Sequence, residues 1–237
     1  MDLVPWHPNV RVLRSSNGIL AINKPSGLIS HPNKENCKVA NSLILAPYDL
    51  QREAYIIKNE FVYLLNRLDS PTSGIVLLTM HTSVAHKVRE AFRYGRIKKM
   101  YQALVKGRVP QSTLWKDVLR TVKNEKQQLR SRCQHGGVDA QTEVHVERYG
   151  QLKEHAYTQL MLCPQTGRTH QLRVQCASRN FPILGDRTYG DFAFNRLLHL
   201  KRLYLHAHFT AFDIDSIHFE AKADCPWSDD VQTITIA

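Results

Sequence analysis

The chain has 237 residues, 43% of them hydrophobic, which suffices for one domain with a sizeable core. Lys and Arg number 32 against 21 Asp and Glu, and the formal charge of +11 favours a polyanionic partner, nucleic acid first. No segment has the roughly 18 uncharged apolar residues of a membrane span, and residues 1–17 have no signal-peptide core. We therefore expect a cytoplasmic protein that does not bind membranes.

The first predicted element is a hairpin, with strands at 10–13 and 19–22 around a turn at 15–18. A loop follows at 23–32, rich in Pro and Gly. Further on, residues 61–68 and 75–79 predict strands that flank a Ser, Pro and Gly turn. The later predicted elements are a helix over 84–92 that ends at Gly95 and strands over 101–105, 142–146, 158–162, 203–212 and 217–221.

Strands outnumber helices and do not alternate regularly with them. This predicts an α+β fold, a largely antiparallel mixed sheet with flanking helices and loops, in a single domain over 1–237 with a tail at 1–9. The five cysteines include no C-x-x-C pair, and no H-x-x-x-H pair lies on a convincing helix, so we expect no metal site.

Residues 111–137 form a basic inserted segment, which we expect to be a hairpin or arm. The segment has two interpretations of equal weight, a solvated hairpin or an arm that contacts phosphates. A second basic cluster follows the predicted helix. The cations are Lys116, Arg120, Lys123, Lys126, Arg130 and Arg132 in the segment, and Arg93, Arg96, Lys98 and Lys99 in the cluster.

The stretch LLNRLDSPTSG places Arg67 and Asp69 two residues apart, so a strand there would direct both side chains to one face. Pro71 keeps the preceding residue extended, and Gly74 permits backbone angles that other residues resist. The simpler interpretation is that Asp69 only stabilises an Asx-type turn. The stretch alone does not separate a turn residue from a catalytic one.

The stretch GRTHQLR predicts a helix capped by Thr169, which puts Arg173 about one turn inside the helix. The helix dipole disfavours a cation there by about 0.3–1 kcal/mol, so Arg173 requires a nearby anion. A local carboxylate, a phosphate or a catalytic carboxylate would each serve. The cluster of Arg168, His170 and Arg173 predicts a polar concavity at this point.

The motifs NRLDSPTSG, KKMYQALVKG, GRTHQLRVQ, PILGDRTYG and LHAHFTAF, with NKPSGLISHP before them, occur in one order along the chain. In that order and spacing, residues 19–212 resemble the RluA-type family of RNA pseudouridine synthases. The resemblance implies a pseudouridine synthase catalytic domain with a central RNA-binding cleft. It also implies an isomerase that acts on uridines of tRNA or ribosomal RNA without a cofactor, and we expect a monomer.

By resemblance, Asp69 is the catalytic carboxylate, acting on C1′ as a nucleophile or on the C2′ proton as a base. Arg67 would fill the gap left by the flipped uridine. Tyr101 would pack against the flipped base and is a candidate for handling the C5 proton. The resemblance also implies that Arg173 pairs with Asp69, which would supply one of the anions that the helix argument allows.

The chain departs from the family at Asn66, where His is usual; strand parity directs Asn66 away from Arg67 and Asp69 and predicts a structural effect. Because about nine residues precede the first strand, we expect no S4-type RNA-binding domain. The catalytic domain would then bind RNA itself, and its candidates are Arg67, Arg96, Lys98, Lys99, Lys123, Lys126, Arg130, Arg168 and His170.

Two other functions compete with this one. A catalytically silent RNA-binding paralogue would keep the fold and the charge, but the joint presence of Arg67, Asp69, Tyr101 and Arg173 argues against it. A metal-dependent nuclease needs clustered acidic ligands, which the sequence lacks.

Overall fold

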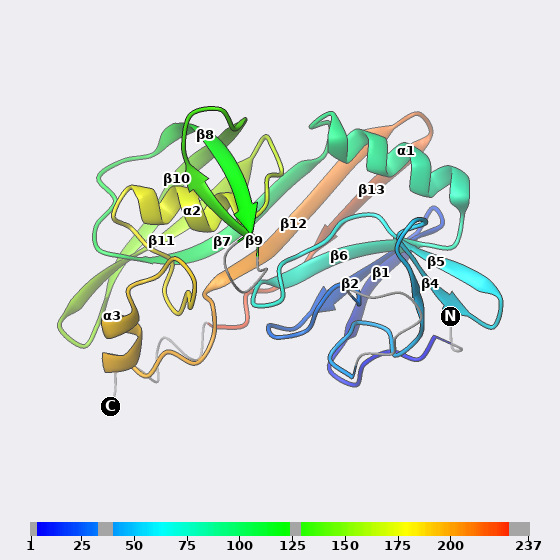
Figure 1. Cartoon of the computed structure of the whole chain (residues 1–237), viewed down its shortest axis with the longest axis horizontal. Coiled ribbons are helices and arrows are strands. Elements are labelled where there is room, and N and C mark those ends of the chain that lie inside the picture. The colour runs from blue at the N-terminus through cyan, green and yellow to red at the C-terminus, as the bar shows by residue number, and fades with distance from the viewer. Residues whose placement is uncertain (1–3, 33–39, 124–128, 228–237) are drawn as a thin grey trace. The chain divides into compact units, whose positions relative to one another are not determined.

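The computed structural model describes residues 4–32, 40–123 and 129–227 (Figure 1). Contacts along the chain divide it into two compact units. Unit 1 consists of Met1–Lys98 and Ala207–Ala223, and unit 2 of Lys99–His206 and Asp224–Ala237. Within the described residues, no helix has the length and apolar character needed to cross a membrane.

Unit 1 is built around strand β6 (Ser73–Thr79), whose residues are all buried. Strand β6 pairs antiparallel with both β2 and β5. Ala85, Val88 and Ala91 of helix α1 share a hydrophobic cluster with strand residues of this unit. Its other elements are β1 (Arg11–Ser16), β2 (Ile19–Lys24), β3 (Tyr48–Asp49), β4 (Ala54–Ile57), β5 (Glu60–Leu64), α1 (Thr82–Arg93), β13 (Ile217–Lys222) and most of β12 (Leu205–Ile214).

Two local predictions for unit 1 are confirmed. Strands β1 and β2 form the early hairpin, and Asn17 and Gly18 at its turn have φ of 51° and 71°. Such angles suit the tight turns that match the twist of paired strands. Helix α1 ends just before Gly95, which has φ of 71° and lets the Arg96 N–H reach the Ala91 carbonyl at 2.9 Å.

Unit 2 has a sheet in the order β7-β11-β10-β8-β9, with every neighbouring pair antiparallel. One hydrophobic cluster joins residues of β7, β10 and β11 with residues of α2 and α3. The elements are β7 (Lys98–Lys106), β8 (Thr113–Lys123), β9 (Leu129–Cys133), β10 (Val138–Leu152), β11 (His155–Pro164), α2 (Gln171–Ser178) and α3 (Phe192–Leu197).

The predicted fold class is confirmed, since the described residues form an α+β protein with mostly antiparallel pairing and few helices. Helix α3 was not predicted, because six residues are too few to show a helical period. Its start did carry a signal: the side chain of Asp191 accepts a hydrogen bond from Phe194 N at 2.9 Å, as an N-cap. The basic segment 111–137 contains the β8–β9 hairpin.

Candidate active site

The loop that carries Asp69 begins earlier than predicted. Strand β5 ends at Leu64, so the strand predicted over 61–68 is confirmed only for its first half, and strand parity cannot be used to place Arg67 and Asp69 on one face. Pairing with β6 stops because the side chain of Asn66 takes the place of the main chain. Its Oδ1 accepts a hydrogen bond from Leu77 N at 2.7 Å, and its Nδ2 donates to Ile75 O at 3.3 Å.

The role of Asn66 can be measured directly. We expect Asn66→Ala to lower the free energy of unfolding by about 1–3 kcal/mol, because it leaves the buried Leu77 N–H without this acceptor. Asn66→Asp keeps the acceptor for Leu77 N but places a second oxygen against the Ile75 carbonyl. Its free energy of unfolding should therefore lie between those of the wild type and Asn66→Ala. Urea unfolding measures both. If Asn66→Ala is as stable as the wild type, the side chain is not holding this loop.

A buried lysine organises the turn after Asp69. The side chain of Lys24 is fully buried at the end of β2, and its Nζ donates to Pro25 O at 3.1 Å, Leu28 O at 2.7 Å and Ser70 O at 2.9 Å. Charge-assisted hydrogen bonds to carbonyls are what make a buried ammonium tolerable. Lys24 therefore joins the 23–32 loop to the residue that follows Asp69.

The serines of the 23–32 loop complete this connection. Ser26 Oγ donates to Pro71 O at 2.7 Å, and Ser30 Oγ donates to Leu68 O at 2.8 Å while accepting from Leu68 N at 3.0 Å. The hydroxyl of Ser70 returns a hydrogen bond to Gly27 O at 2.9 Å. Main-chain groups on both sides of Asp69 are thus held by the NKPSGLIS motif.

The turn itself closes through the main chain, with Thr72 N donating to the carbonyl of Asp69 at 3.0 Å. Gly74 follows with φ of 115°, and a Cβ there would lie 2.3 Å from the carbonyl oxygen of Ala207. Only glycine allows this approach of β12. Asp69 itself is partly exposed. The nearby Arg67 is exposed, and its Nη1 forms an ion pair with Oε1 of Glu53 at 3.1 Å.

In unit 2, helix α2 starts at Gln171, two residues after Thr169, so the predicted cap was wrong. His170 is the N-cap and has φ of 56°. The loop is shaped instead by Gln171, whose Oε1 accepts from Arg168 N at 3.0 Å and Thr166 Oγ1 at 2.8 Å. Arg173 is the third residue of the helix, slightly nearer its start than the predicted position about one turn inside.

The anion that Arg173 requires is present in its own unit. Its Nε and Nη2 donate to the two carboxylate oxygens of Asp186, each at 2.8 Å, and the side chains are 4% and 1% exposed. Burial alone would raise the pKa of Asp186. The hydrogen bonds and charge of Arg173, with the N–H groups of Thr188 and Tyr189, outweigh burial and hold this pKa below its ordinary value.

The β8–β9 hairpin is attached to the start of α2. Ser131 on β9 donates from its N–H to Tyr189 Oη at 2.9 Å and from its hydroxyl to Thr169 O at 2.7 Å. The same Tyr189 hydroxyl shares a hydrogen bond of 2.7 Å with His170 Nδ1, and its ring lies 5.2 Å from the guanidinium of Arg173. The basic hairpin and Arg173 thus share one supporting tyrosine.

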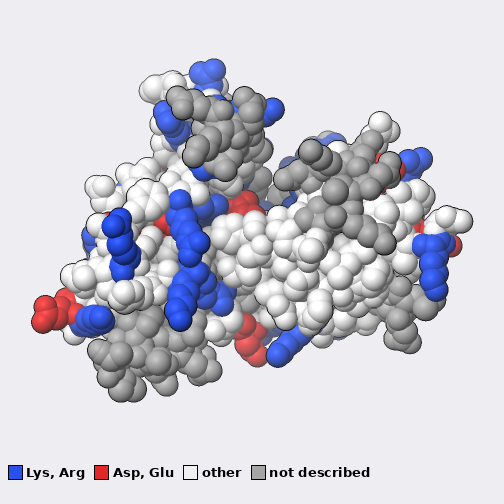
Figure 2. Space-filling view, turned by 60° about the horizontal axis from the view of Figure 1, so that its bottom comes forward, with Lys and Arg blue, Asp and Glu red and all other residues white. Residues whose placement is uncertain are grey.

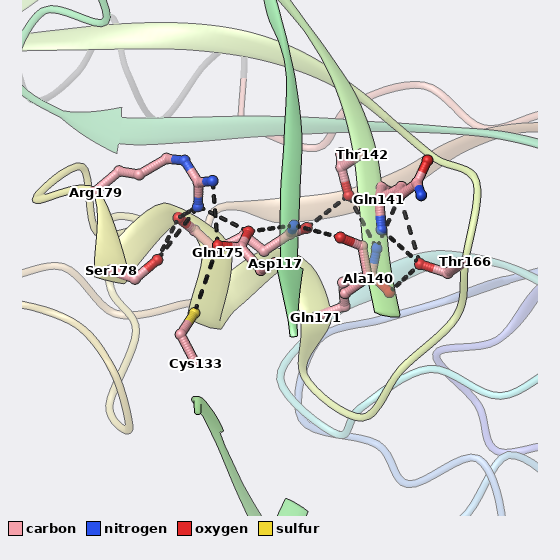
Figure 3. A network of polar contacts seen from close by, with 10 residues as sticks. All are labelled: Asp117, Cys133, Ala140, Gln141, Thr142, Thr166, Gln171, Gln175, Ser178 and Arg179. Carbon is pink, nitrogen blue, oxygen red and sulfur yellow. Dashed lines mark hydrogen bonds and ion pairs between the residues drawn. The ribbon is translucent and has the colours of Figure 1, made fainter. Parts of the chain in front are cut away.

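A network of hydrogen bonds and an ion pair connects α2 to strands β8 and β10 (Figure 3). Asp117 of β8 accepts hydrogen bonds from Arg179 Nη1 at 2.9 Å and from Gln175 Nε2 at 2.7 Å. The buried Gln175 in turn accepts from Thr142 of β10 at 2.6 Å, and Gln171 donates to the same hydroxyl at 3.0 Å. Because α2 is fixed at both ends, the direction of Arg173 is fixed with it.

The structure brings Arg168, His170 and Arg173 together at the start of α2, while Arg67 and Asp69 lie in unit 1. Tyr101 lies on β7 opposite Leu162 of β11 and is partly buried. The pairing of Arg173 with Asp69 and the role of Tyr101 stay predictions.

The predicted RNA-binding cations lie in different surroundings. Arg96 and Lys98 are exposed, with Lys98 Nζ 5.8 Å from the Phe209 ring centroid. Lys99 is partly buried, and this burial lowers its pKa to about 8. Lys123 is exposed at the end of β8 and Arg130 is partly exposed on β9, while Lys126 lies outside the described residues.

Lys24 and Asp186 were missed by sequence reasoning. Lys24 ends an otherwise largely apolar strand, and Asp186 follows Gly185 in the PILGDRTYG motif, so each carried a weak signal. Their importance depends on partners far along the chain, which local patterns do not show.

Comparisons with known proteins agree on the family. Residues 18–178 match the family model described as RNA pseudouridylate synthase. The chain is 31% identical to tRNA pseudouridine synthase C of Haemophilus ducreyi, over 91% of this chain and 92% of that protein. It is 30% identical to ribosomal large subunit pseudouridine synthase C of Buchnera aphidicola, over 84% of this chain but only 61% of that protein.

Among solved structures, the human RNA pseudouridylate synthase domain containing 1 aligns with a TM-score of 0.75 at 22% identity, covering 95% of this chain and 87% of that one. This likeness concerns the fold. Together with the matched motifs, the family model and the relatives show that the chain belongs to the RNA pseudouridylate synthase family.

Proposed function

We propose that this protein is an RNA pseudouridine synthase that isomerises uridines in tRNA or ribosomal RNA. The observation that supports it most is the rigid support of Asp69, since the buried Lys24 and the serines of its loop hold main-chain groups on both sides of this residue. A residue that only formed a turn would not require such support from a distant loop. The names of the relatives point to the same two classes of RNA.

In the proposed reaction the N1–C1′ bond of a uridine breaks, the uracil rotates, and a C5–C1′ bond forms. The proton at C5 is lost and N1 gains one, so the change is an isomerisation without net redox chemistry. Asp69 acts at the sugar, either attacking C1′ or removing the C2′ proton. The target must first leave its stack, at a cost of a few kcal/mol, so loop uridines are favoured.

The remaining residues assist in this proposal. Arg67 occupies the space left by the flipped uridine, Tyr101 packs against the base, and Arg173 pairs with Asp69. The ion pair with Asp186 already holds the side chain of Arg173 in one conformation, which lowers the entropic cost of any further contact it makes.

The test is release of tritium from RNA labelled at C5 of uridine, with tRNA and ribosomal RNA assayed separately. RNA lacking modification at the relevant sites, from cells without the gene, is the substrate. We expect release from at least one fraction in amounts stoichiometric with single sites. If the protein binds RNA but releases no tritium from either fraction, it is a silent paralogue and the proposed enzyme is wrong.

The β8–β9 hairpin is proposed to contact phosphates. Neutralising Lys123, Lys126 and Arg130 together should weaken RNA binding and lower the slope of log Kd against log salt by about 2, since each phosphate contact contributes about 0.7–0.9. Filter binding at several salt concentrations measures this. An unchanged slope would exclude the hairpin from the interface and favour the solvated alternative.

A further inference from the structure

Unit 2 contains a pocket whose lining residues have no role in the proposed catalytic site. The pocket has a volume of about 320 Å³ and lies beside α3, and its lining combines cationic, aromatic and amide side chains. Phe192, at the start of α3, is 55% exposed. Phe192 and Arg196 are four residues apart on this helix, so they lie on one side of it. The lining residues are Gly185, Arg187, Phe192, Asn195, Arg196 and Leu200.

The walls of this pocket are held by Asn195. Its Oδ1 accepts from Gly185 N at 2.9 Å, its Nδ2 donates to Asp186 O at 3.0 Å, and its carbonyl accepts from Leu200 N at 2.9 Å. Gly185 has φ of 71°, and a Cβ there would lie 1.7 Å from Arg202 O. The pocket is therefore a built feature of the loop and not a gap between mobile side chains.

The charge of the pocket is unbalanced. Arg187 and Arg196 are exposed, and neither forms an ion pair with any residue that the structure describes. The neighbouring carboxylates are engaged elsewhere, Asp186 with Arg173 and Asp191 with Lys106 at 2.6 Å. In the view of Figure 2, Lys and Arg side chains gather on the surface of unit 2, with acidic side chains scattered among them. The uncompensated positive charge of this pocket therefore favours an anionic ligand.

We propose that this pocket binds one nucleotide of the RNA substrate other than the uridine that is modified. Arg187 and Arg196 contact the phosphate, and the exposed ring of Phe192 stacks on the base. An acidic peptide would match the charge but would make no use of the exposed ring. The inference rests on the proposed function only in taking RNA as the partner.

A neighbouring pocket of about 310 Å³ does not have this character. Its lining includes Lys106 and Asp191, which neutralise each other at 2.6 Å, and no exposed phenylalanine. The contrast favours the pocket beside α3 as the anion site.

The test compares two variants with a matched control in RNA-binding measurements, which do not depend on activity. Arg187→Ala/Arg196→Ala should raise Kd for the RNA about tenfold and lower the salt slope by about 1.5. Phe192→Ser should raise Kd about tenfold with the slope unchanged. The control, Arg11→Ala/Arg14→Ala, removes two exposed arginines of β1 and should stay within twofold of wild type.

Folding is verified by circular dichroism, and Arg187→Lys/Arg196→Lys should restore most of the salt slope. The inference is overturned if both variants bind RNA like the wild type, or if the control weakens binding as much. Binding of polyglutamate is measured alongside RNA binding. The inference is also overturned if the variants lose polyglutamate binding but keep RNA binding, which would identify an acidic polypeptide as the ligand. Weakened RNA binding together with no tritium release by the wild type would refute the proposed function and leave this inference standing.

Discussion

Asp69→Asn is expected to lower the rate of tritium release by at least about 10³-fold, because the amide can neither attack C1′ nor accept the C2′ proton. The two side chains have nearly the same size, and the turn is closed by the main chain of Asp69, so the fold should be preserved. RNA binding should change less than threefold. Single-turnover assays with saturating enzyme separate the chemical step from binding.

Asp224→Asn is the matched control, since it makes the same change at an exposed position of unit 2. It should retain wild-type release. A residual rate within tenfold of wild type for Asp69→Asn would mean that another group performs the chemistry, and the turn-residue interpretation of Asp69 would be restored.

Asp186→Asn is expected to lower the free energy of unfolding by about 3 kcal/mol, because it removes the buried carboxylate that holds the charge of Arg173. The matched control is Asp191→Asn, whose ion pair with Lys106 is partly exposed and whose amide can still cap α3; it should lose less than about 1 kcal/mol. Urea unfolding measures both. If both variants lose the same free energy of unfolding, the buried pair of Asp186 with Arg173 contributes no more to stability than the partly exposed pair of Asp191 with Lys106.

The same pair predicts a pH dependence. Because the pKa of Asp186 is lowered on folding, its contribution to stability is fully present above the unfolded pKa of about 4 and is lost as the pH falls through the lower folded value. The stability difference between wild type and Asp186→Asn should therefore be constant from pH 7 to about 4 and shrink below that. A difference that grows toward acid pH would contradict the assignment of Asp186 as the ionised partner.

Much of the local structure follows from short-range signals. The Asn17–Gly18 turn and the Gly95 helix end depend on backbone angles that few residues adopt readily, so their positions could be read directly from the sequence. The apolar patterns predicted most strands of both units, with ends uncertain by a few residues, but the short strands β3 and β4 were not predicted. The family motifs added the candidate site residues.

The end of β5 could not be predicted in this way. Apolar residues continue past Leu64 to Leu65 and return at Leu68, so the sequence shows no end there. In the fold, the side chain of Asn66 competes with the main chain for Ile75 and Leu77 of β6, which are nine and eleven residues away. A side chain that replaces main-chain pairing leaves no periodic signal. The placement of Arg67 and Asp69 in a loop is therefore a property of the folded chain.

By itself, the sequence determined the α+β class, the basic character, the family and the residues Asp69, Tyr101 and Arg173 as candidates. Only the tertiary structure decided what supports them: Lys24 holds the turn after Asp69, and Asp186 holds Arg173. The physical reason is the same in both cases. A buried charge is stable only beside the groups that compensate it, and which groups those are is settled by packing between distant segments.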